Sequence, residues 1–291
     1  DDLGSRGLGD VYKRQLVIKK LINSWGEIMT VKYYDWVEYQ SNFRPEKVAI
    51  KEISSSKELT YKTLNDRSKA LAGWLQKNGL EKGDRVAILS HNCAEVFELE
   101  FACGKIGGIE LPLNWRLTKP ELEYILKDSS PKVLIYSIEF KEIAEALLKD
   151  CDIKNSLEIE ENNFSSSYEA AISENNDFTN IECTHDDLIM LMYTSGTTGH
   201  PKGAMITHRM QFFNIVNLAS TARITDKAVQ LVSLPLFHTG GMNCYANPVL
   251  HNGGQIILTK EFDPGKALEI INNPEYGVTH LFAVPAPYQF M

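Results

Sequence analysis

Apolar and polar residues follow helical and strand-like periods in turn along most of the chain. The clearest helical stretch covers residues 60–76, where Leu64, Leu71 and Leu75 share one face and Thr60 can cap the N-terminus. Short runs of consecutive apolar residues predict strands at 85–90, 109–111, 133–136, 188–193, 229–233, 255–258 and 278–284. Because these runs do not alternate with polar residues, both faces of the strands are expected to be buried.

The remaining segments complete an alternation of strands and helices. Further helices are predicted at 95–106, 119–127, 207–219 and 264–271. The stretch 151–180 is rich in Asn, Ser and Glu, so we expect a surface excursion there rather than core. This order predicts an α/β fold of stacked, mostly parallel sheets covered by helices, without an internal repeat.

Both ends of the sequence look unlike natural termini. Residues 1–15 carry three Gly and six charges without apolar periodicity, as cloning or adapter sequence would. The purine-rich codons implied by Trp25-Gly26-Glu27 resemble a ribosome-binding site translated in frame, which makes Met29 the expected natural start. We therefore expect residues 1–28 to be non-native, with a genuine N-terminal helix as the alternative, and residues 29–291 to be an incomplete domain.

Composition narrows the class of protein. The 291 residues are 43% hydrophobic and 23% charged, and 38 acidic against 30 basic residues leave a net charge of −8. A protein that coats nucleic acid needs a basic face, so that role is excluded. No apolar run approaches the roughly 20 residues that span a bilayer. The five cysteines are dispersed without a C-x-x-C pair, which indicates reduced thiols in a cytoplasmic protein rather than disulfides or a zinc site.

The most informative stretch is YTSGTTGHPKG at residues 193–203, directly after a predicted buried strand. Small, hydroxyl-bearing residues let the backbone close around an anion, and Lys202 adds a point charge suited to phosphate. A Walker A loop is excluded, because Pro201 stands where the second glycine of that motif is required. A flexible turn that binds nothing is the alternative, but the loop's position at a strand end favours ligand binding.

This stretch resembles the signature of the acyl-adenylate-forming superfamily, which includes acyl-CoA synthetases, aryl-CoA ligases, luciferases and peptide-synthetase adenylation domains. Further stretches agree in order and spacing, namely LTYKTLN at 59–65, KGDRVA at 82–87, LPLNWRLT at 111–118 and PLFHTGG at 235–241. The likeness runs from about Val31 to Met291 and is strongest to acyl-CoA synthetases. It implies the large N-terminal domain of the adenylate-forming fold, truncated to roughly the first half of a family chain.

The resemblance implies a two-step reaction with ATP, Mg²⁺ and CoA. A carboxylate attacks the α-phosphate of ATP to give an acyl-adenylate and pyrophosphate, and the CoA thiol then takes the acyl group. The residues that would hold the β- and γ-phosphates are Ser195, Gly196, Thr197, Thr198, Gly199 and Lys202. Thr194 would help to hold Mg²⁺, and Thr194, Lys202 and His238 would form the catalytic set. His200 stands at a variable position of the motif and receives no role.

By the same resemblance, His238, Thr239, Gly240 and Gly241 would line the substrate pocket, although a packed loop histidine is the simpler interpretation of His238 alone. Peptide-synthetase domains place an Asp in this region for the amino group of their substrate, and its absence disfavours an amino acid. A plain fatty or aryl carboxylic acid fits better, and of these we expect a fatty acid. An aryl-acid or other adenylating ligase and a non-catalytic nucleotide-binding remnant stay open as alternatives.

Several other residues have simpler interpretations. Arg116 is expected to anchor its loop, and Cys244 to line the pocket or belong to the core. We expect His91 and His208 to cap or pack, and see no ligand-spaced partner for His185, His251 or His280. The family's Tyr-Gly-x-Thr-Glu, Thr-Gly-Asp and C-terminal lysine are absent, and residues 276–280 only imitate the first of these. The chain alone should therefore bind adenylate weakly and turn over little.

Overall fold

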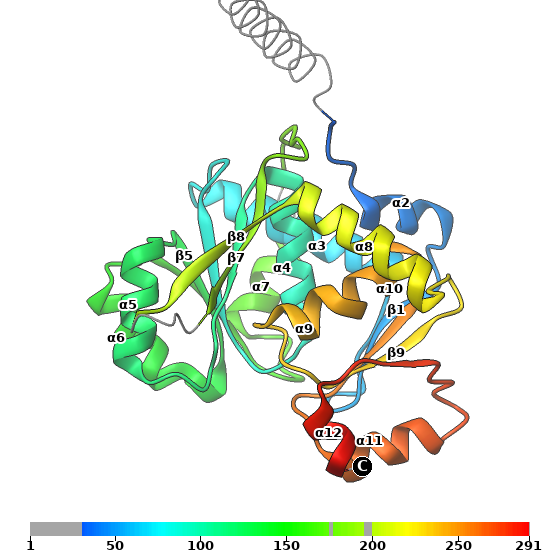
Figure 1. The fold of residues 1–291 in the computed structure, drawn as a ribbon. Helices are drawn as coiled ribbons and strands as arrows, with labels where there is room; N and C mark the ends of the chain where they lie inside the picture. Colours follow the sequence, from blue (N-terminus) through cyan, green and yellow to red (C-terminus); the bar gives the residue numbers. More distant parts are fainter. Residues whose placement is uncertain (1–30, 175–176, 195–199, 291) are drawn as a thin grey trace, which may run out of the picture.

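A computed structural model describes residues 31–174, 177–194 and 200–290. Residues 1–28, which we expect to be non-native, lie outside this range. The described chain forms two stacked β-sheets with helices between and around them (Figure 1). Within it, no helix combines the length and apolar character needed to cross a bilayer.

The first sheet has the strand order β6-β5-β3-β4-β7-β8. All neighbouring strands in it are parallel except β7 and β8, which are antiparallel. Its strands are β3 (Arg85–Leu89), β4 (Ile109–Pro112), β5 (Val133–Ser137), β6 (Asn155–Ile159), β7 (Leu188–Thr194) and β8 (Lys202–Thr207).

The second sheet has the order β11-β9-β10-β1-β2, and only the β1–β2 pair is antiparallel. The strands are β1 (Val48–Glu52), β2 (Glu58–Thr60), β9 (Val229–Val232), β10 (Gln255–Leu258) and β11 (His280–Leu281). The predicted α/β class with stacked, mostly parallel sheets is therefore confirmed.

The main helices match the apolar periods of the sequence, and their ends match its capping signals. Thr60 accepts a hydrogen bond from the Thr63 amide at 3.1 Å, and Thr118 forms a capping box with Glu121. The helices are α2 (Trp36–Phe43), α3 (Tyr61–Lys77), α4 (Ala94–Ile106), α5 (Lys119–Ser129), α6 (Lys141–Asp150), α7 (Ser167–Ser173), α8 (His208–Ala222), α9 (Thr239–Gly241), α10 (Asn247–His251), α11 (Pro264–Asn272) and α12 (Pro285–Phe290).

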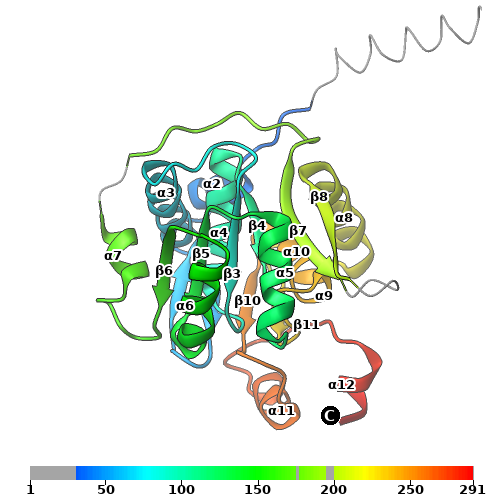
Figure 2. The same ribbon diagram turned by 90° about the vertical axis from the view of Figure 1, so that its left-hand side faces the viewer.

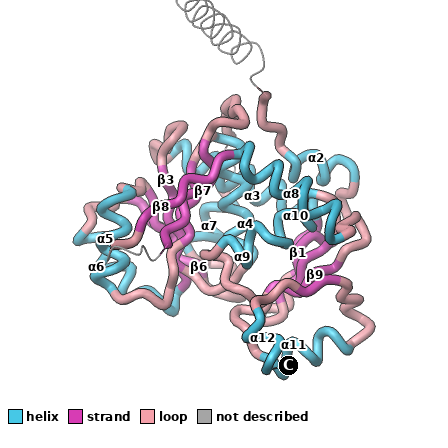
Figure 3. The backbone as a smooth tube through the Cα atoms, viewed as in Figure 1, coloured by secondary structure: helices cyan, strands magenta, loops and turns pink. Residues whose placement is uncertain are grey.

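Successive side chains along a strand point to opposite faces of the sheet and so belong to different parts of the core. On β5, Val133 and Ile135 join the cluster between the sheets, whereas Leu134 and Tyr136 pack against α5 and α6 on the outer face (Figure 2). The second sheet is covered on its outer face by α11. Between the sheets lies α4, all of whose residues are buried, and Figure 3 shows helices separating the two groups of strands.

The structure corrects the expectation for residues 151–180. This stretch is not merely a surface excursion, because it contributes β6, which pairs in parallel with β5, and the helix α7. Tyr168 on α7 is fully buried and donates to Glu98 at 2.7 Å. Few apolar residues suffice here, since Leu157, Ile159 and Tyr168 are buried in the core between the sheets while most polar residues between them are partly or fully exposed.

Other predicted boundaries also differ. The strand predicted at 278–284 shrinks to His280–Leu281, because the chain leaves the sheet before Pro285 and enters α12. The predictions also lacked β1, β2, β8 and α6. The three strands are short, and β2 and β8 are partly exposed, so their patterns are weak. Helix α6 has a clear apolar face that includes the buried Ala144 and Leu147, so its signal was present in the sequence.

Candidate functional site

The glycine- and hydroxyl-rich stretch connects two antiparallel strands at one edge of the first sheet. Thr194, the last residue of β7, pairs across the ladder with Lys202, the first residue of β8, and both are exposed. Because directly paired residues of antiparallel strands point to the same face of a sheet, the Thr194 hydroxyl and the Lys202 ammonium group lie on one face of the hairpin. The five residues expected to cradle phosphate, Ser195, Gly196, Thr197, Thr198 and Gly199, lie outside the described residues.

Helix α5 braces the base of this loop. The Tyr193 hydroxyl donates to Asp128 at 2.5 Å, and the His200 ring stacks on Tyr124 with centroids 4.9 Å apart. His200, to which no ligand role was assigned, thus has a packing contact. On β8, a Cβ at Gly203 would stand 2.8 Å from Leu191 Cδ1, so the glycine leaves room for the Leu191 side chain of the adjacent strand β7.

The second predicted stretch follows β9 and forms a tight loop that leads into α9. His238 is the N-cap of α9, and its Nδ1 accepts a hydrogen bond from the Gly240 amide at 3.0 Å. Since Nδ1 is an acceptor, the neutral imidazole carries its proton on Nε2 and can donate to a ligand oxygen from there. A Cβ at Gly241 would stand 2.2 Å from the Pro235 carbonyl oxygen, so only glycine fits.

Beyond Gly241 the chain continues as a π-helix, η2 (Met242–Ala246), a form that is frequent at functional sites. Cys244 is half-buried in it, which leaves both of its predicted interpretations open. Asn243 is buried and accepts from Asn247, which in turn donates to Glu100 on α4 at 2.8 Å. A buried polar network thus holds the segment that follows the predicted pocket.

An aromatic group lies beside the same loop. Trp115 contacts Phe237 edge to face, and the Arg116 guanidinium lies 4.5 Å from the Trp115 ring centre and 5.6 Å from that of Phe237. His91 packs on the other side of Trp115, with centroids 4.3 Å apart. These contacts agree with an anchoring role for Arg116 and a packing role for His91.

Three histidines meet in a place that sequence spacing did not indicate. His185, His208 and His251 line a cavity of about 10 Å³ beneath α2. His208 stacks on Tyr33 with centroids 4.0 Å apart, and burial lowers the pKa of both His208 and His251 to about 4. Among the described residues, no three or more His, Cys, Asp or Glu side chains are placed to hold a metal ion. We interpret the three as packed, neutral histidines.

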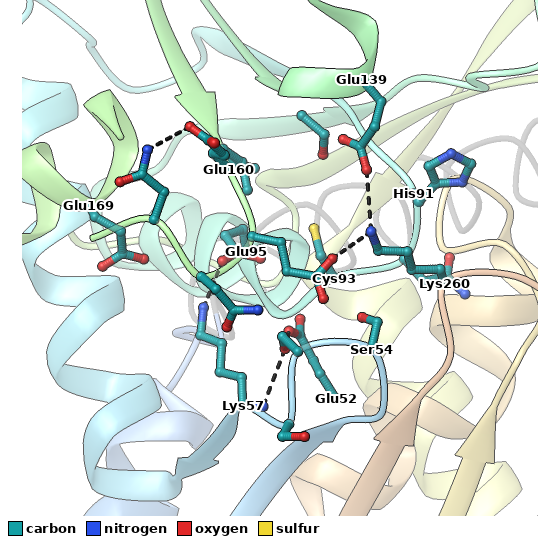
Figure 4. Close-up of a pocket in the computed structure, with 18 of the residues that line it drawn as sticks. Glu52, Ser54, Lys57, His91, Cys93, Glu95, Glu139, Glu160, Glu169 and Lys260 are labelled. Atoms are coloured by element: carbon teal, nitrogen blue, oxygen red, sulfur yellow. Dashed lines mark hydrogen bonds and ion pairs between the residues drawn. The ribbon is translucent and has the colours of Figure 1, made fainter. Parts of the chain in front are cut away.

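A larger cavity of about 310 Å³ opens where the carboxyl ends of β1, β3, β5, β6 and β10 converge (Figure 4). Its cations are already paired, since Lys57 contacts Glu95 at 2.6 Å and Lys260 contacts Glu161 at 2.5 Å. Burial raises the pKa of Glu52 in its wall to about 7. A cavity with neutralised cations and additional carboxylates suits a phosphate poorly, unlike the exposed Lys202.

Comparison with known proteins agrees with these features. Residues 37–291 match the family model described as "AMP-binding enzyme". A feruloyl-CoA synthase of Amycolatopsis is 36% identical over 254 residues, which are 87% of this chain and 49% of that relative. A long-chain-fatty-acid–CoA ligase of Mycobacterium tuberculosis is 32% identical, over 90% of this chain and 51% of the relative. The chain therefore spans about half the length of the curated relatives it matches.

Solved structures extend the comparison to the fold. The N-terminal domain of FACL13 from Mycobacterium tuberculosis has a TM-score of 0.80 and 31% identity, over 88% of this chain and 63% of that one. A putative long-chain-fatty-acid CoA ligase from Rhodopseudomonas palustris also has a TM-score of 0.80, with 26% identity over 90% of this chain and 65% of that one. With the family model matched over residues 37–291, this chain belongs to the AMP-binding enzyme family and has the fold of the N-terminal domain of adenylate-forming enzymes.

Proposed function

We propose that this chain supplies the nucleotide- and acid-binding half of a cytoplasmic acid–thiol ligase. The complete enzyme would activate a carboxylic acid with ATP and pass the acyl group to CoA. The observation that supports this most is the β7–β8 hairpin, where Thr194 and Lys202 are paired across the ladder on either side of a stretch that is rich in small residues. Within the described part of the chain no carboxylate pairs with Lys202, so its charge is available to an anionic ligand.

In the proposed reaction, the substrate carboxylate oxygen attacks the α-phosphorus of ATP and pyrophosphate leaves. Lys202 and the amides and hydroxyls of residues 195–199 would hold the β- and γ-phosphates and stabilise the charge on the departing pyrophosphate. The CoA thiol then attacks the acyl carbonyl carbon, and AMP leaves. His238 would orient the acid or the α-phosphate by donating from Nε2, while its Nδ1 stays engaged with the Gly240 amide.

A magnesium ion fits this site through the chemistry of its donors. Mg²⁺ prefers oxygen ligands and usually binds through substrate phosphates, several waters and one or two protein oxygens. Thr194 places an exposed hydroxyl at the strand end beside the phosphate loop, so it would supply such an oxygen. The ion would neutralise phosphate charge when bound. Thr194 would thereby fix where the triphosphate lies relative to Lys202.

For the acid we propose a fatty or related carboxylic acid, with an aryl acid as the second candidate. No carboxylate follows His238 in the loop to bind an amino group, which disfavours an amino acid as the substrate. The aryl candidate is favoured by a specific comparison, since a relative named feruloyl-CoA synthase is 36% identical.

Lys202→Met tests the nucleotide site. We expect the affinity for ATP with Mg²⁺, measured by isothermal titration calorimetry, to fall at least tenfold because the charge that faces the phosphates is lost. Lys154→Met is the matched control, since Lys154 is an exposed lysine that pairs with Asp152 on another edge of the protein. Equal ATP affinity in the wild type and Lys202→Met would contradict the proposed role of Lys202.

Two further measurements separate the substrate classes and the remnant hypothesis. Non-hydrolysable dodecanoyl- and feruloyl-sulfamoyladenosine can be titrated into the same protein, and we expect the dodecanoyl compound to bind more tightly. Tighter binding of the feruloyl compound would favour the aryl-acid candidate. A nucleotide-binding remnant would bind ATP but gain nothing from either acyl group. We also expect little ATP–pyrophosphate exchange by this chain alone, and rapid exchange would refute that expectation.

A further inference from the structure

The loop that follows β3 touches the loop that carries His238, although the two belong to different sheets. Asn92 lies at this contact and is buried. Its side-chain Nδ2 donates to the Leu234 carbonyl at 2.9 Å and to the Thr259 carbonyl at 3.2 Å. Its Oδ1 accepts from the Leu236 amide at 2.9 Å. One amide side chain therefore joins β3 of the first sheet to the segments that follow β9 and β10 of the second.

These hydrogen bonds hold the two residues on either side of Pro235. The Pro235 carbonyl oxygen accepts from the His238 amide at 3.2 Å, and it lies where a Cβ at position 241 would come within 2.2 Å. The backbone of this turn is therefore closely packed from Leu234 to Gly241. A shift of Leu234 or Leu236 would be transmitted to His238 and to the start of α9, because no gap in the turn can absorb it.

The neighbouring residue holds the same loop from a second side. The His91 ring packs on Trp115 with centroids 4.3 Å apart, and Trp115 contacts Phe237 edge to face at 6.5 Å. Phe237 directly precedes His238. His91 and Asn92, adjacent in sequence, therefore restrain the loop through an aromatic contact and through its backbone, respectively.

We propose that Asn92 is a positioning residue that sets the place of His238 and of the acyl pocket by clamping residues 234–236. The inference rests on the proposed function, in which the loop 235–241 lines the pocket for the carboxylic acid. Asn92 acts through the loop and does not touch the substrate. Asn92 lies outside both the stretch 193–203 and the stretch 235–241, so matching these motifs assigns it no role.

The side chain must both donate and accept, which gives its variants distinct behaviour. Asn92→Ala removes all three hydrogen bonds and so deprives the Leu234 and Thr259 carbonyls and the Leu236 amide of these partners. Asn92→Asp keeps the acceptor for Leu236 but places a carboxylate beside two carbonyl oxygens. Protonation of that carboxyl at low pH would restore one donor, so the Asp variant should recover as the pH falls.

The experiment compares wild type, Asn92→Ala and Asn92→Asp in binding of ATP with Mg²⁺ and of dodecanoyl- and feruloyl-sulfamoyladenosine. Asn78→Ala is the control, because Asn78 makes a similar side-chain bond to a carbonyl, that of Trp74, at the end of α3. For Asn92→Ala we expect at least a tenfold loss of affinity for the acyl compound that the wild type prefers. ATP affinity should stay within twofold of wild type. For Asn92→Asp the deficit relative to wild type should narrow between pH 7.5 and pH 5.5.

A nitrogen NMR spectrum of the histidine rings supplies a readout that does not depend on ligand binding. We expect the Nδ1 resonance of His238 to shift in Asn92→Ala and to stay in place in Asn78→Ala. The proposal is overturned if both variants leave that resonance unchanged, or if Asn92→Ala weakens ATP and acyl-adenylate binding equally. If the wild type binds none of the three ligands, the proposed function fails, and the NMR comparison still decides whether Asn92 positions the loop.

Discussion

Replacing Glu110 with Gln should stabilise the protein at alkaline pH. Glu110 on β4 and Glu100 on α4 are both fully buried, and burial raises the pKa of each carboxyl, that of Glu100 to about 7. Within the described part of the chain, neither oxygen of Glu110 has a hydrogen-bond partner. The Glu100 carboxyl raises the pKa of Glu110 further, so ionising both groups inside the fold is unfavourable.

The sign and size of the effect follow from proton linkage. Both carboxyls are protonated in the folded and the unfolded chain well below pH 4.5, so neither alters stability there. As the pH rises, the unfolded chain ionises first, and the folded state loses stability until the folded pKa is passed. For Glu100, a rise from 4.5 to about 7 corresponds to about 3 kcal/mol, at 1.36 kcal/mol per unit. Burial and the neighbouring Glu100 raise the pKa of Glu110 well above 4.5, so its ionisation changes stability in the same direction.

The assay is urea unfolding followed by circular dichroism at pH 5 and pH 9. We expect the free energy of unfolding of Glu110→Gln to lie close to that of wild type at pH 5 and clearly above it at pH 9, because the amide stays uncharged. Glu46→Gln, a change at an exposed position, is the control and should show no such trend. A difference that does not change with pH, or a variant that is less stable at pH 9, would refute the reasoning.

Two more changes probe the pocket loop and the histidine cavity. Gly241→Ala should destabilise the fold by about 2–3 kcal/mol in the same urea assay, because the new methyl group would stand 2.2 Å from the Pro235 carbonyl oxygen. Gly265→Ala, whose Cβ would make only a 3.4 Å contact, should cost much less. His208→Phe keeps the stacking on Tyr33 but removes a ring whose pKa burial lowers to about 4. Since the unfolded histidine binds a proton near pH 6.5, His208 should contribute a loss of about 3 kcal/mol as the pH falls from 6.5 to 4, and the variant should lack that contribution.

Much of the local structure was predictable because its causes are local. The cap at Thr60, the apolar face of α3 and the capping box at Thr118 depend on residues within one or two helical turns of each other. The strand 255–258 was predicted with its observed bounds. The stretch 193–203 could be recognised for the same reason, since its motif consists of consecutive residues.

Elements with weak local patterns were missed. Residues 151–180 read as surface because polar residues outnumber apolar ones, yet β6 is held by backbone pairing to β5 and α7 by the burial of Tyr168. Strand β8 is largely exposed and exists because it pairs with β7. Pairing between distant segments decides such elements, and it leaves little trace in the composition of either segment.

The sequence by itself determined the fold class, the four longest described helices and the glycine- and hydroxyl-rich stretch that we propose to bind phosphate. Only the tertiary structure decided that Asn92 holds the loop of His238, 146 positions further along the chain. It likewise decided that Glu100 and Glu110 are both buried and close enough for the Glu100 carboxyl to raise the pKa of Glu110. These contacts depend on how two sheets pack around α4. Packing of that kind is set by the summed shape of many side chains rather than by any short pattern.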